Sequence, residues 1–401
     1  MKIILVNRWY PPYTGFGGVA AYDTYLAHAL AKLGHEVAVL AARWTKDAPA
    51  LQQDGPVRVM RLLAPEWPRL KRLPVFSRYL RPVQQSIYSL SVARALNALR
   101  GFDRPDVVEF AEVNAEGYHY LRQRNHIPAV VRCHTPTFVL RRYYAAEEMP
   151  FDTAWTAAME ADSIRRANLR SAPSRDMADV IAHDLSMPAD AFTVIPNALD
   201  VDLFRQPPRQ RQPDDEIIIL HVGRLERVKG VEVLARAFIE ISEQTPRARL
   251  VFVGDDRPDG AGSTWRTRLE RQFAAHGLQS RVQFTGGIDQ QELLRWYARA
   301  DLAVVPSMLY ESFSYTCAQA MAAGLPVIAT RIGGVPETVG DCGLIVEPGD
   351  SDGLAGALLE LINQQDTRIL LGKKAQERAQ SFFDAGRVAR LTLDLYQGIT
   401  R

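Results

Sequence analysis

Short apolar runs that alternate with segments of helical periodicity constrain the fold of this chain more than any other feature. Residues 2–7 form such a run without polar alternation, as expected for a central strand of a parallel sheet. Residues 19–32 then place apolar side chains at helical spacing, Gly34 ends that segment, and residues 36–41 form the next apolar run. This order predicts a strand, a helix and a second, parallel strand.

The alternation recurs in two series along the chain. The first series predicts a long helix at 152–170 and strands at 2–7, 36–41, 106–110, 129–132, 171–173 and 193–195. The second series predicts strands at 216–222, 249–253, 282–284, 302–305 and 326–329. We therefore expect an α/β fold with two Rossmann-like, doubly wound lobes that face a central cleft.

A polar connector separates the two series. Residues 205–216 contain almost no apolar side chain and include prolines at two sites, as is typical of an exposed linker. A chain of 401 residues is long enough to bury two cores. We predict lobes at residues 1–198 and 199–383, with a C-terminal helix at about 384–401 that packs back on the first lobe.

Composition argues against several classes of protein. The 48 basic and 46 acidic residues give a formal net charge of +2, which offers no global case for nucleic-acid binding. Cys133, Cys317 and Cys342 are far apart and lack metal-ligand spacing, so we expect no disulfide framework, no zinc site and a reducing compartment. The sequence shows no signal peptide and no apolar run of membrane-spanning length, which favours a cytoplasmic protein.

The segment 305–324 carries the strongest functional signal. A strand is predicted to end there, Ser312 or Ser314 can cap the helix that follows, and Gly324 lies where a C′ glycine would end it. Backbone N–H groups at such a helix start attract phosphate. The carboxylate of Glu311, just before them, is suited to accept hydrogen bonds from sugar hydroxyls. The pairing indicates a phosphorylated sugar.

The loop that follows the predicted strand 216–222 supplies cations. It is framed by Gly223 and Gly230, and Arg224 can chelate phosphate oxygens as a fork while Lys229 acts as a point charge on the same diphosphate. The alternative is that both cations are solvated surface side chains. Their place at a strand end, opposite Glu311 on a neighbouring strand, favours the functional interpretation.

A glycine-rich loop follows the first strand. Its Gly15, Gly17 and Ala20 match the dinucleotide fingerprint, but Gly15 lies nine residues past Val6 and no acidic residue ends the next strand. Nicotinamide binding is therefore disfavoured. Two alternatives stay open: Gly17 and Gly18 let a ligand approach the backbone closely, or the segment is an ordinary connection between a strand and a helix.

Two further strand ends carry polar side chains. His134 follows the predicted strand 129–132, a position that is as consistent with a catalytic role as with a structural one. Asp255 and Asp256 can hold a divalent cation together with a phosphate, although a local turn is the commoner use of such a pair.

Residues 67–100 are basic, without an acidic side chain, and interleaved with apolar and aromatic residues. Such a segment can contact an anionic membrane surface or an acidic acceptor. It can also be the solvated face of an ordinary helix pair. A membrane contact would place the protein at the inner face of the membrane.

These motifs, taken in order, resemble the retaining glycosyltransferases of the GT-B fold, in the large family-four group (glycosyltransferase group 1) that uses nucleotide-sugar donors. The resemblance covers nearly the whole chain. It rests on residues 11–18, 34–37, 195–197 with Asp200, 222–224 with 229–230, 311–324, 326–330, 333–337 and 343–346.

The resemblance implies a hexosyltransferase of polysaccharide biosynthesis, with an acceptor-binding N-terminal lobe and a donor-binding C-terminal lobe. It implies His134, Arg224, Lys229 and Glu311 as catalytic residues. It implies a donor site made of Gly17, Gly18, Gly223, Arg224, Lys229, Gly287, Glu311, Phe313, Ser314, Tyr315 and Gln319. The co-substrate would be a nucleotide sugar, UDP-linked, with no metal and no further cofactor, and the acceptor a glycan, a lipid-linked compound or a small molecule.

The chain departs from the family pattern at two places. Gln319 stands where the family has a second Glu for the nucleotide ribose, and Ser312-Phe313-Ser314 stands where it has Gly-Phe-Gly. Because an amide forms weaker hydrogen bonds than a carboxylate, we expect weaker or altered donor binding. Two other activities stay open: a nucleotide-sugar epimerase or phosphorylase on the same scaffold, and a catalytically degenerate partner protein.

Overall fold

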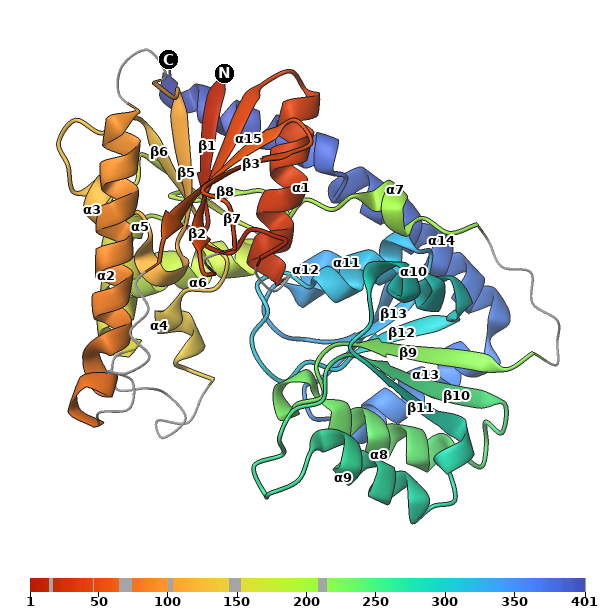
Figure 1. Cartoon of the computed structure of the whole chain (residues 1–401). Coiled ribbons are helices and arrows are strands. Elements are labelled where there is room, and N and C mark those ends of the chain that lie inside the picture. Colours follow the sequence, from red (N-terminus) through yellow and green to blue (C-terminus); the bar gives the residue numbers. More distant parts are fainter. Residues whose placement is uncertain are drawn as a thin grey trace. The chain divides into compact units, whose positions relative to one another are not determined.

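The computed structural model describes residues 1–13, 17–45, 47–64, 74–99, 104–143, 153–207 and 215–400, with the backbone alone for 74–79 and 400. The chain divides into two compact units, and Figure 1 labels helices and strands of each. Unit 1 comprises Met1–Leu199 together with Ala385–Arg401, and unit 2 comprises Asp200–Asp384. Two α/β units with parallel sheets are the fold class that the sequence indicated.

Unit 1 is built on an eight-stranded sheet in the order β3-β4-β2-β1-β5-β6-β7-β8, parallel except for β3. Its strands are β1 Lys2–Val6, β2 Glu36–Arg43, β3 Leu51–Asp54, β4 Val57–Leu63, β5 Val107–Ala111, β6 Ala129–Arg132, β7 Leu169–Ala172 and β8 Thr193–Val194. Its helices are α1 Gly18–Lys32, α2 Pro74–Ala98, α3 Tyr118–Leu121, α4 Thr137–Leu140, α5 Thr153–Arg166, α6 Arg175–Leu185 and α15 Ala385–Thr400, with a 3-10 turn η2 at Val113–Ala115. Helices α1 and α15 pack together, as do α2, α3 and α5 (Figure 1).

Unit 2 is built on a six-stranded, wholly parallel sheet in the order β11-β10-β9-β12-β13-β14. Its strands are β9 Ile217–Val222, β10 Ala248–Val253, β11 Val282–Gly286, β12 Leu302–Val305, β13 Val327–Thr330 and β14 Gly343–Val346. Its helices are α7 Val201–Phe204, α8 Val231–Ile241, α9 Trp265–Ala274, α10 Gln290–Arg299, α11 Tyr315–Ala322, α12 Val335–Val339, α13 Ser351–Asn363 and α14 Gln365–Phe382, with 3-10 turns η4 at Arg227–Lys229 and η5 at Gln279–Arg281.

The helices of unit 2 form two layers. Helix α8 packs against α9 and α13, whereas α11 packs against α7, α12 and α14 (Figure 1). Every residue of β12 and of β13 is buried, because helices cover both faces of the sheet. This burial explains why these strands are uninterrupted apolar runs in the sequence.

Each sheet has a point at which the strand order reverses. In unit 2 the chain leaves β9 for β10 on one side and later places β12 on the other side, so the reversal lies between β9 and β12. In unit 1 the corresponding point lies between β1 and β5. Open α/β sheets bind ligands beyond the carboxyl ends of the strands at such points.

The structure corrects several details of the sequence prediction. The helix predicted at 152–170 ends at Arg166, because Asn168 accepts a hydrogen bond from the backbone of Ala129 at 2.9 Å and β7 begins at Leu169. Strands β3 and β4 were missed. Strand β4 buries only alternate residues, so it lacks the continuous apolar run of the central strands.

The basic segment at 67–100 lies partly outside the described residues, which omit 67–73 and 100. Its described part is one 25-residue helix, α2, that contains Pro82, and it is not a helix pair. Within the described ranges, no helix is both long enough and apolar enough to cross a membrane.

Candidate functional site

The loop after β9 is held tightly against the loop after β12. Gly230 adopts a φ of +67°, and a Cβ atom there would lie 1.8 Å from the carbonyl oxygen of Pro306. The backbone N–H of Met308 donates to the carbonyl of Val228 at 2.8 Å. Only glycine fits this close approach, so the position of Lys229 is fixed relative to the end of β12.

Helix α11 begins and ends as the sequence predicted. Between the two candidate caps, the structure selects Ser314, whose side chain accepts a hydrogen bond from the N–H of Cys317. Gly324, with a φ of +81°, follows the C-cap residue Ala323. The eight-residue helix therefore points its N-terminus at the same sheet edge as Glu311.

Lys229 and Glu311 form an ion pair across the point of reversal. The Lys229 Nζ lies 2.5 Å from Glu311 Oε1, and their side chains are 31% and 14% exposed. Ser307 Oγ donates to the same carboxylate oxygen at 2.7 Å. Burial alone would raise the pKa of Glu311, but the charge of Lys229 and the hydrogen bonds from Lys229, Ser307 and Ser314 hold it below its usual value. Glu311 is therefore ionised at neutral pH.

Arg224 lies on the same loop as Lys229 but has a different partner. Its Nη2 lies 2.8 Å from Glu226 Oε1, and its side chain is 53% exposed. The two cations are thus both paired with carboxylates in this structure, and a diphosphate would have to compete with these pairs or share them. Gly223 packs close to both Lys229 and His221.

Gln319 faces a tyrosine from a neighbouring helix. The hydroxyl of Tyr297, on α10, donates to Gln319 Oε1 at 3.2 Å. The amide oxygen is therefore already engaged, and the amide nitrogen takes no part in that bond. Tyr297 itself packs edge-on against Phe204, with ring centroids 5.9 Å apart.

The remaining predicted donor residues of unit 2 lie at the same edge. Phe313 is buried between the rings of Tyr315 and Phe383, each with a centroid distance of 5.3 Å. At Gly287 a Cβ atom would lie 2.2 Å from Asp255 Oδ1, so this position packs directly against the turn after β10.

The turn after β10 is hydrogen-bonded to the loop after β9 and to the start of α9. The carbonyl of Asp255 accepts from the N–H of Leu225 at 2.8 Å, and Asp256 Oδ1 accepts from the N–H of Arg266 at 3.0 Å. These bonds join the acidic pair to other segments of unit 2, and neither is a bond within the turn itself. Across the described residues, no three His, Cys, Asp or Glu side chains are grouped so that they could hold a metal ion.

Sequence reasoning missed His221, the fifth residue of β9. Its ring is buried, Nδ1 lies 3.1 Å from the carbonyl of Val304, and Nε2 has no hydrogen-bond partner among the described residues. Burial lowers the pKa of His221 to about 4, so the ring is neutral at pH 7, with Nδ1 donating and Nε2 left as an acceptor near Gly223. A polar residue inside an apolar strand, one position before Val222, is the signal that could have found it.

The predicted residues of unit 1 also lie near one another. His134 follows β6 by two positions and is buried, and its ring contacts that of Tyr22 on α1 edge-on at 5.2 Å. Helix α1 begins at Gly18, with Gly17 as its N-cap, and a Cβ atom on Gly17 would meet nothing within 4 Å. Gly15 and the dinucleotide match that depends on it lie outside the described residues.

Burial and the nearby charge of Arg132 hold the pKa of His134 well below its usual value. The imidazole is therefore neutral at pH 7. Its Nε2 has no hydrogen-bond partner among the residues that the structure describes. Two buried carboxylates that the sequence did not single out, Glu112 and Glu160, bond the backbone of the segment that carries His134.

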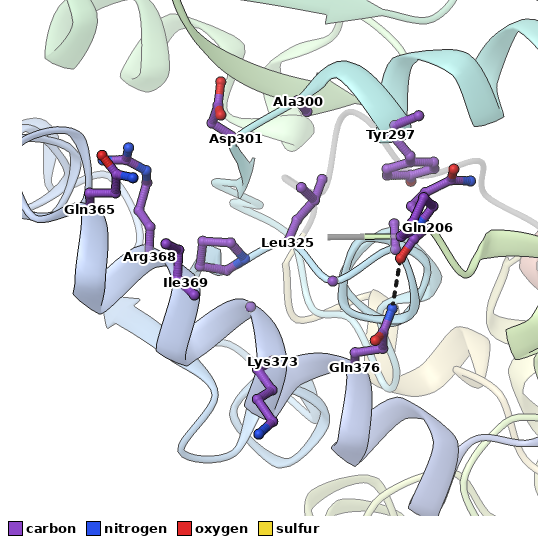
Figure 2. A pocket seen from close by; sticks show the side chains of 16 residues that line it. Gln206, Tyr297, Ala300, Asp301, Leu325, Gln365, Arg368, Ile369, Lys373 and Gln376 are labelled. Atoms are coloured by element: carbon purple, nitrogen blue, oxygen red, sulfur yellow. Dashed lines mark hydrogen bonds between the residues drawn. The ribbon is translucent and has the colours of Figure 1, made fainter. Parts of the chain in front are cut away.

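A cavity of about 310 Å³ lies elsewhere in unit 2 (Figure 2). Its walls include the turns that lead into β12 and β13, such as Asp301 and Leu325, and residues of α14 such as Lys373. These turns lie at the amino ends of the strands, so the cavity is at the sheet edge opposite to Lys229 and Glu311. Tyr297 lines this cavity while its hydroxyl bonds Gln319.

Comparisons with known proteins agree with the geometry. The family model for glycosyl transferases group 1 matches residues 204–378, and the model for Glycosyltransferase Family 4 matches residues 16–203. The chain is 29% identical over 399 residues to a D-inositol 3-phosphate glycosyltransferase of Corynebacterium aurimucosum, which covers 94% of this chain and 90% of that protein.

Solved structures show the same arrangement of elements. Sucrose-phosphate synthase of Thermosynechococcus elongatus superimposes with a TM-score of 0.80 at 26% identity, over 99% of this chain and 98% of that one. Anabaena HepE in complex with UDP-glucose has a TM-score of 0.68 at 20% identity, over 99% and 100%, a likeness that shows the fold alone. With two adjoining family matches across residues 16–378, the chain belongs to the group 1 glycosyltransferases of the GT-B fold.

Proposed function

We propose that this glycosyltransferase moves a hexose from a UDP-linked donor to a glycan, lipid-linked or small-molecule acceptor, with retention of anomeric configuration and without a metal. The observation that carries the proposal is the Lys229–Glu311 pair at 2.5 Å, which spans the carboxyl ends of β9 and β12. Anabaena HepE, which has this fold, was solved with UDP-glucose, and that supports a UDP-sugar as the first donor to test.

Each donor group has a counterpart in unit 2. In our proposal Arg224 and Lys229 bind the diphosphate, and Glu311 accepts hydrogen bonds from hydroxyls of the transferred sugar. The start of α11, at Phe313, Ser314 and Tyr315, offers backbone donors to the sugar and phosphate. Gln319 bonds the ribose, and Gly223 and Gly287 allow close approach.

Unit 1 would supply the acceptor side. His134 lines the reacting centre as a neutral imidazole, and Gly17 and Gly18 let a phosphate of the donor or acceptor approach the start of α1.

The reaction requires stabilisation of both a negative and a positive charge in the transition state. As the bond to the leaving diphosphate breaks, negative charge grows on its oxygens and positive charge grows at the anomeric carbon. Arg224 and Lys229 oppose the negative charge, which is the work that a metal ion performs in other transferases. In a retaining reaction the acceptor hydroxyl attacks the same face, and the leaving phosphate takes its proton.

A donor screen by mass spectrometry tests the proposal. The purified chain is incubated with UDP-glucose, UDP-N-acetylglucosamine, UDP-galactose and GDP-mannose and a mixture of candidate acceptors, with and without EDTA. We expect an acceptor-dependent product from a UDP-sugar that EDTA does not abolish. Arg224→Ala and Lys229→Ala should each lower turnover by at least about 100-fold. Unchanged turnover in both variants would remove these residues from the site.

The two alternative activities give different results in the same screen. An epimerase or phosphorylase would form product without an acceptor, or with inorganic phosphate alone. A degenerate partner protein, which Gln319 keeps open, would form no product and show no heat when titrated with UDP or GDP in a calorimeter.

We also propose that α2 contacts an anionic membrane surface. Its described side chains include the exposed cations Arg81 and Arg94 and the partly exposed apolar residues Ile87 and Leu90. Sedimentation with vesicles of neutral lipid, with and without an anionic lipid, tests this contact. Absence of pelleting that depends on anionic lipid would remove the membrane from the proposal.

A further inference from the structure

The segment that carries His134 is held by two buried carboxylates. Glu112 lies directly after β5, and its two oxygens accept from the backbone N–H groups of His134, at 2.8 Å, and Thr135, at 2.7 Å. Glu160, on α5, accepts from the N–H of Thr137 at 2.7 Å and from its hydroxyl at 3.0 Å. Residues 134–137, the loop that joins β6 to α4, are thereby fixed at both ends.

The ring of His134 is buried and packs against the ring of Tyr22. Its Nε2 is buried without a hydrogen-bond partner among the described residues, and Tyr22 contacts the ring only through its edge. The backbone of His134, which Glu112 bonds, sets the point from which this ring extends. Each N–H group bonds a different oxygen of Glu112, so both oxygens of this side chain are engaged in holding the loop.

Glu112 lies in a buried region where the ends of β5 and β6 are hydrogen-bonded to each other. Glu112 is 1% exposed, and its own N–H donates to the carbonyl of Arg132 at 3.0 Å, which ties the end of β5 to the end of β6. The next turn holds Asn114 and Ala115 at φ values of +60° and +52°, which non-glycine residues rarely adopt. Glu160 accepts the N–H of Asn114 at 3.0 Å, so the carboxyl that bonds Thr137 also stabilises this strained turn.

We propose that Glu112 is a positioning residue for sugar transfer, which acts by holding the backbone of His134 and Thr135 so that the His134 ring keeps the orientation that transfer requires. This inference rests on the proposed function, because it takes His134 to line the reacting centre. Glu160 supports the same loop from its other end. Glu112 touches neither donor nor acceptor in this proposal.

Glu112→Gln tests the proposal with the least change in shape. An amide has one carbonyl oxygen, so it can accept from one N–H and must turn its NH2 group toward the other. We expect hydrogen exchange in a peptide spanning residues 133–140 to accelerate at least tenfold, measured by mass spectrometry. We expect kcat to fall at least tenfold while the Kd for UDP, bound by unit 2 in our proposal, changes less than twofold.

Glu109→Gln is the matched control. Glu109 lies on β5, the strand that Glu112 follows, is 2% exposed, and accepts from the hydroxyls of Tyr22 and Tyr396, each at 3.0 Å. Hydroxyls rotate and can donate or accept, so an amide satisfies both. Exchange in the loop and kcat should stay within about threefold of the wild type, an allowance that reflects one weakened neutral hydrogen bond.

Several results would overturn the proposal. Unchanged exchange in Glu112→Gln would show that Glu112 does not hold the loop, and faster exchange with unchanged kcat would show that the loop's position does not matter. If Glu112→Gln does not fold, the same measurements are made on Glu112→Asp. Hydrogen exchange at His134 and Thr135 is also measured in the wild-type protein, and exchange there as fast as in exposed loops would contradict the proposal. A wild type that transfers no sugar would refute the proposed function, while the exchange result would stand by itself.

Discussion

At the scale of single residues, Lys229 and Glu311 are proposed to bind different parts of the donor. Lys229 is proposed for the diphosphate and Glu311 for the sugar, yet they are bonded to each other at 2.5 Å. A bound diphosphate must therefore draw Lys229 partly away from Glu311. Replacing either partner should affect phosphate binding and sugar binding differently.

Glu311→Gln should lower kcat/KM for the nucleotide sugar by about 100-fold, because the charged acceptor for sugar hydroxyls is lost. The Kd for UDP, which has no sugar to transfer, should change by less than about threefold, since Lys229 is released from its carboxylate partner. Steady-state kinetics and calorimetry measure the two quantities. Glu347→Gln, an exposed carboxylate paired with Arg331, is the control. Equal losses in both quantities would contradict separate roles.

Gln319 is one of the two places at which this chain departs from its family pattern. In the wild type the Tyr297 hydroxyl lies 3.2 Å from Gln319 Oε1. Gln319→Glu keeps an oxygen for this hydroxyl and adds a charged acceptor. We expect the Kd for UDP to fall by up to about tenfold, the ratio that corresponds to about 1.4 kcal/mol. Adding Tyr297→Phe to Gln319→Glu removes the hydroxyl that bonds this side chain. The double variant therefore shows whether tighter binding comes from the new carboxylate itself or from a change in its orientation. Weaker or unchanged binding in Gln319→Glu would show that this position does not face the ribose.

At the scale of elements, the close approach of the β9 and β12 loops is set by one glycine. Gly230→Ala and Gly277→Ala are a matched pair, since both positions have a φ of +67° but only Gly230 would place a Cβ against Pro306, while nothing lies within 4 Å at Gly277. The left-handed conformation should cost about 1 kcal/mol in both variants. The clash at Gly230 should add about 1–3 kcal/mol, measured by denaturant unfolding, together with weaker UDP binding.

Gly277→Ala should leave UDP binding unchanged. If both variants lose the same stability and bind UDP equally well, the two loops can separate without consequence, and the fixed position of Lys229 would no longer support the site.

Elements are also where sequence prediction succeeded and failed for physical reasons. Strands such as β9 and β12 are predictable because burial on both faces demands continuous apolar runs. A serine cap before α11 is predictable because its bond spans three residues, but the choice between Ser312 and Ser314 came from the structure. Strand β4 was missed since half of its residues are only partly buried. The true end of α5 depends on Asn168 bonding Ala129, a contact between residues far apart in sequence.

The candidate site divides in the same way. Arg224, Lys229 and Glu311 could be proposed because they follow predicted strands, where α/β sheets bind ligands. Tyr297 beside Gln319 could not, because that bond joins two helices whose packing no local pattern encodes. Glu112 could not either, since a lone Glu after a strand gives no sign that it will bond the end of the neighbouring strand.

At the scale of the whole molecule, the buried carboxyls Glu112 and Glu160 of unit 1 and the buried His221 of unit 2 should respond to pH in opposite senses. In unit 1, burial raises the pKa of Glu112 to about 8, with the charge of Glu160 as the next cause, and burial raises the pKa of Glu160 to about 7. In unit 2, burial lowers the pKa of His221 to about 4. The carboxyls favour the folded state at low pH, whereas the neutral imidazole favours it at higher pH.

The signs follow from proton uptake. Between their ordinary pKa of 4.5 and the raised values, Glu112 and Glu160 bind more protons in the folded state than in the unfolded state. Their stabilisation is therefore complete below about pH 4.5 and is lost as the pH rises through about 7 for Glu160 and about 8 for Glu112. The contribution of His221 is complete above pH 6.5 and is lost as the pH falls through about 4.

Raising the pH from 6.5 to 8 should therefore open the core of unit 1 while sparing that of unit 2. Hydrogen exchange, corrected for its intrinsic pH dependence, should accelerate more in β5 and β6 than in β9 and β12. Glu160→Gln removes one titrating carboxyl and should flatten the response of unit 1 alone, because its neutral amide binds no proton in either state. Equal acceleration of hydrogen exchange in both units would mean that Glu112 and Glu160 do not control how the stability of unit 1 changes with pH. The same pH dependence of exchange in Glu160→Gln as in the wild type would lead to the same conclusion.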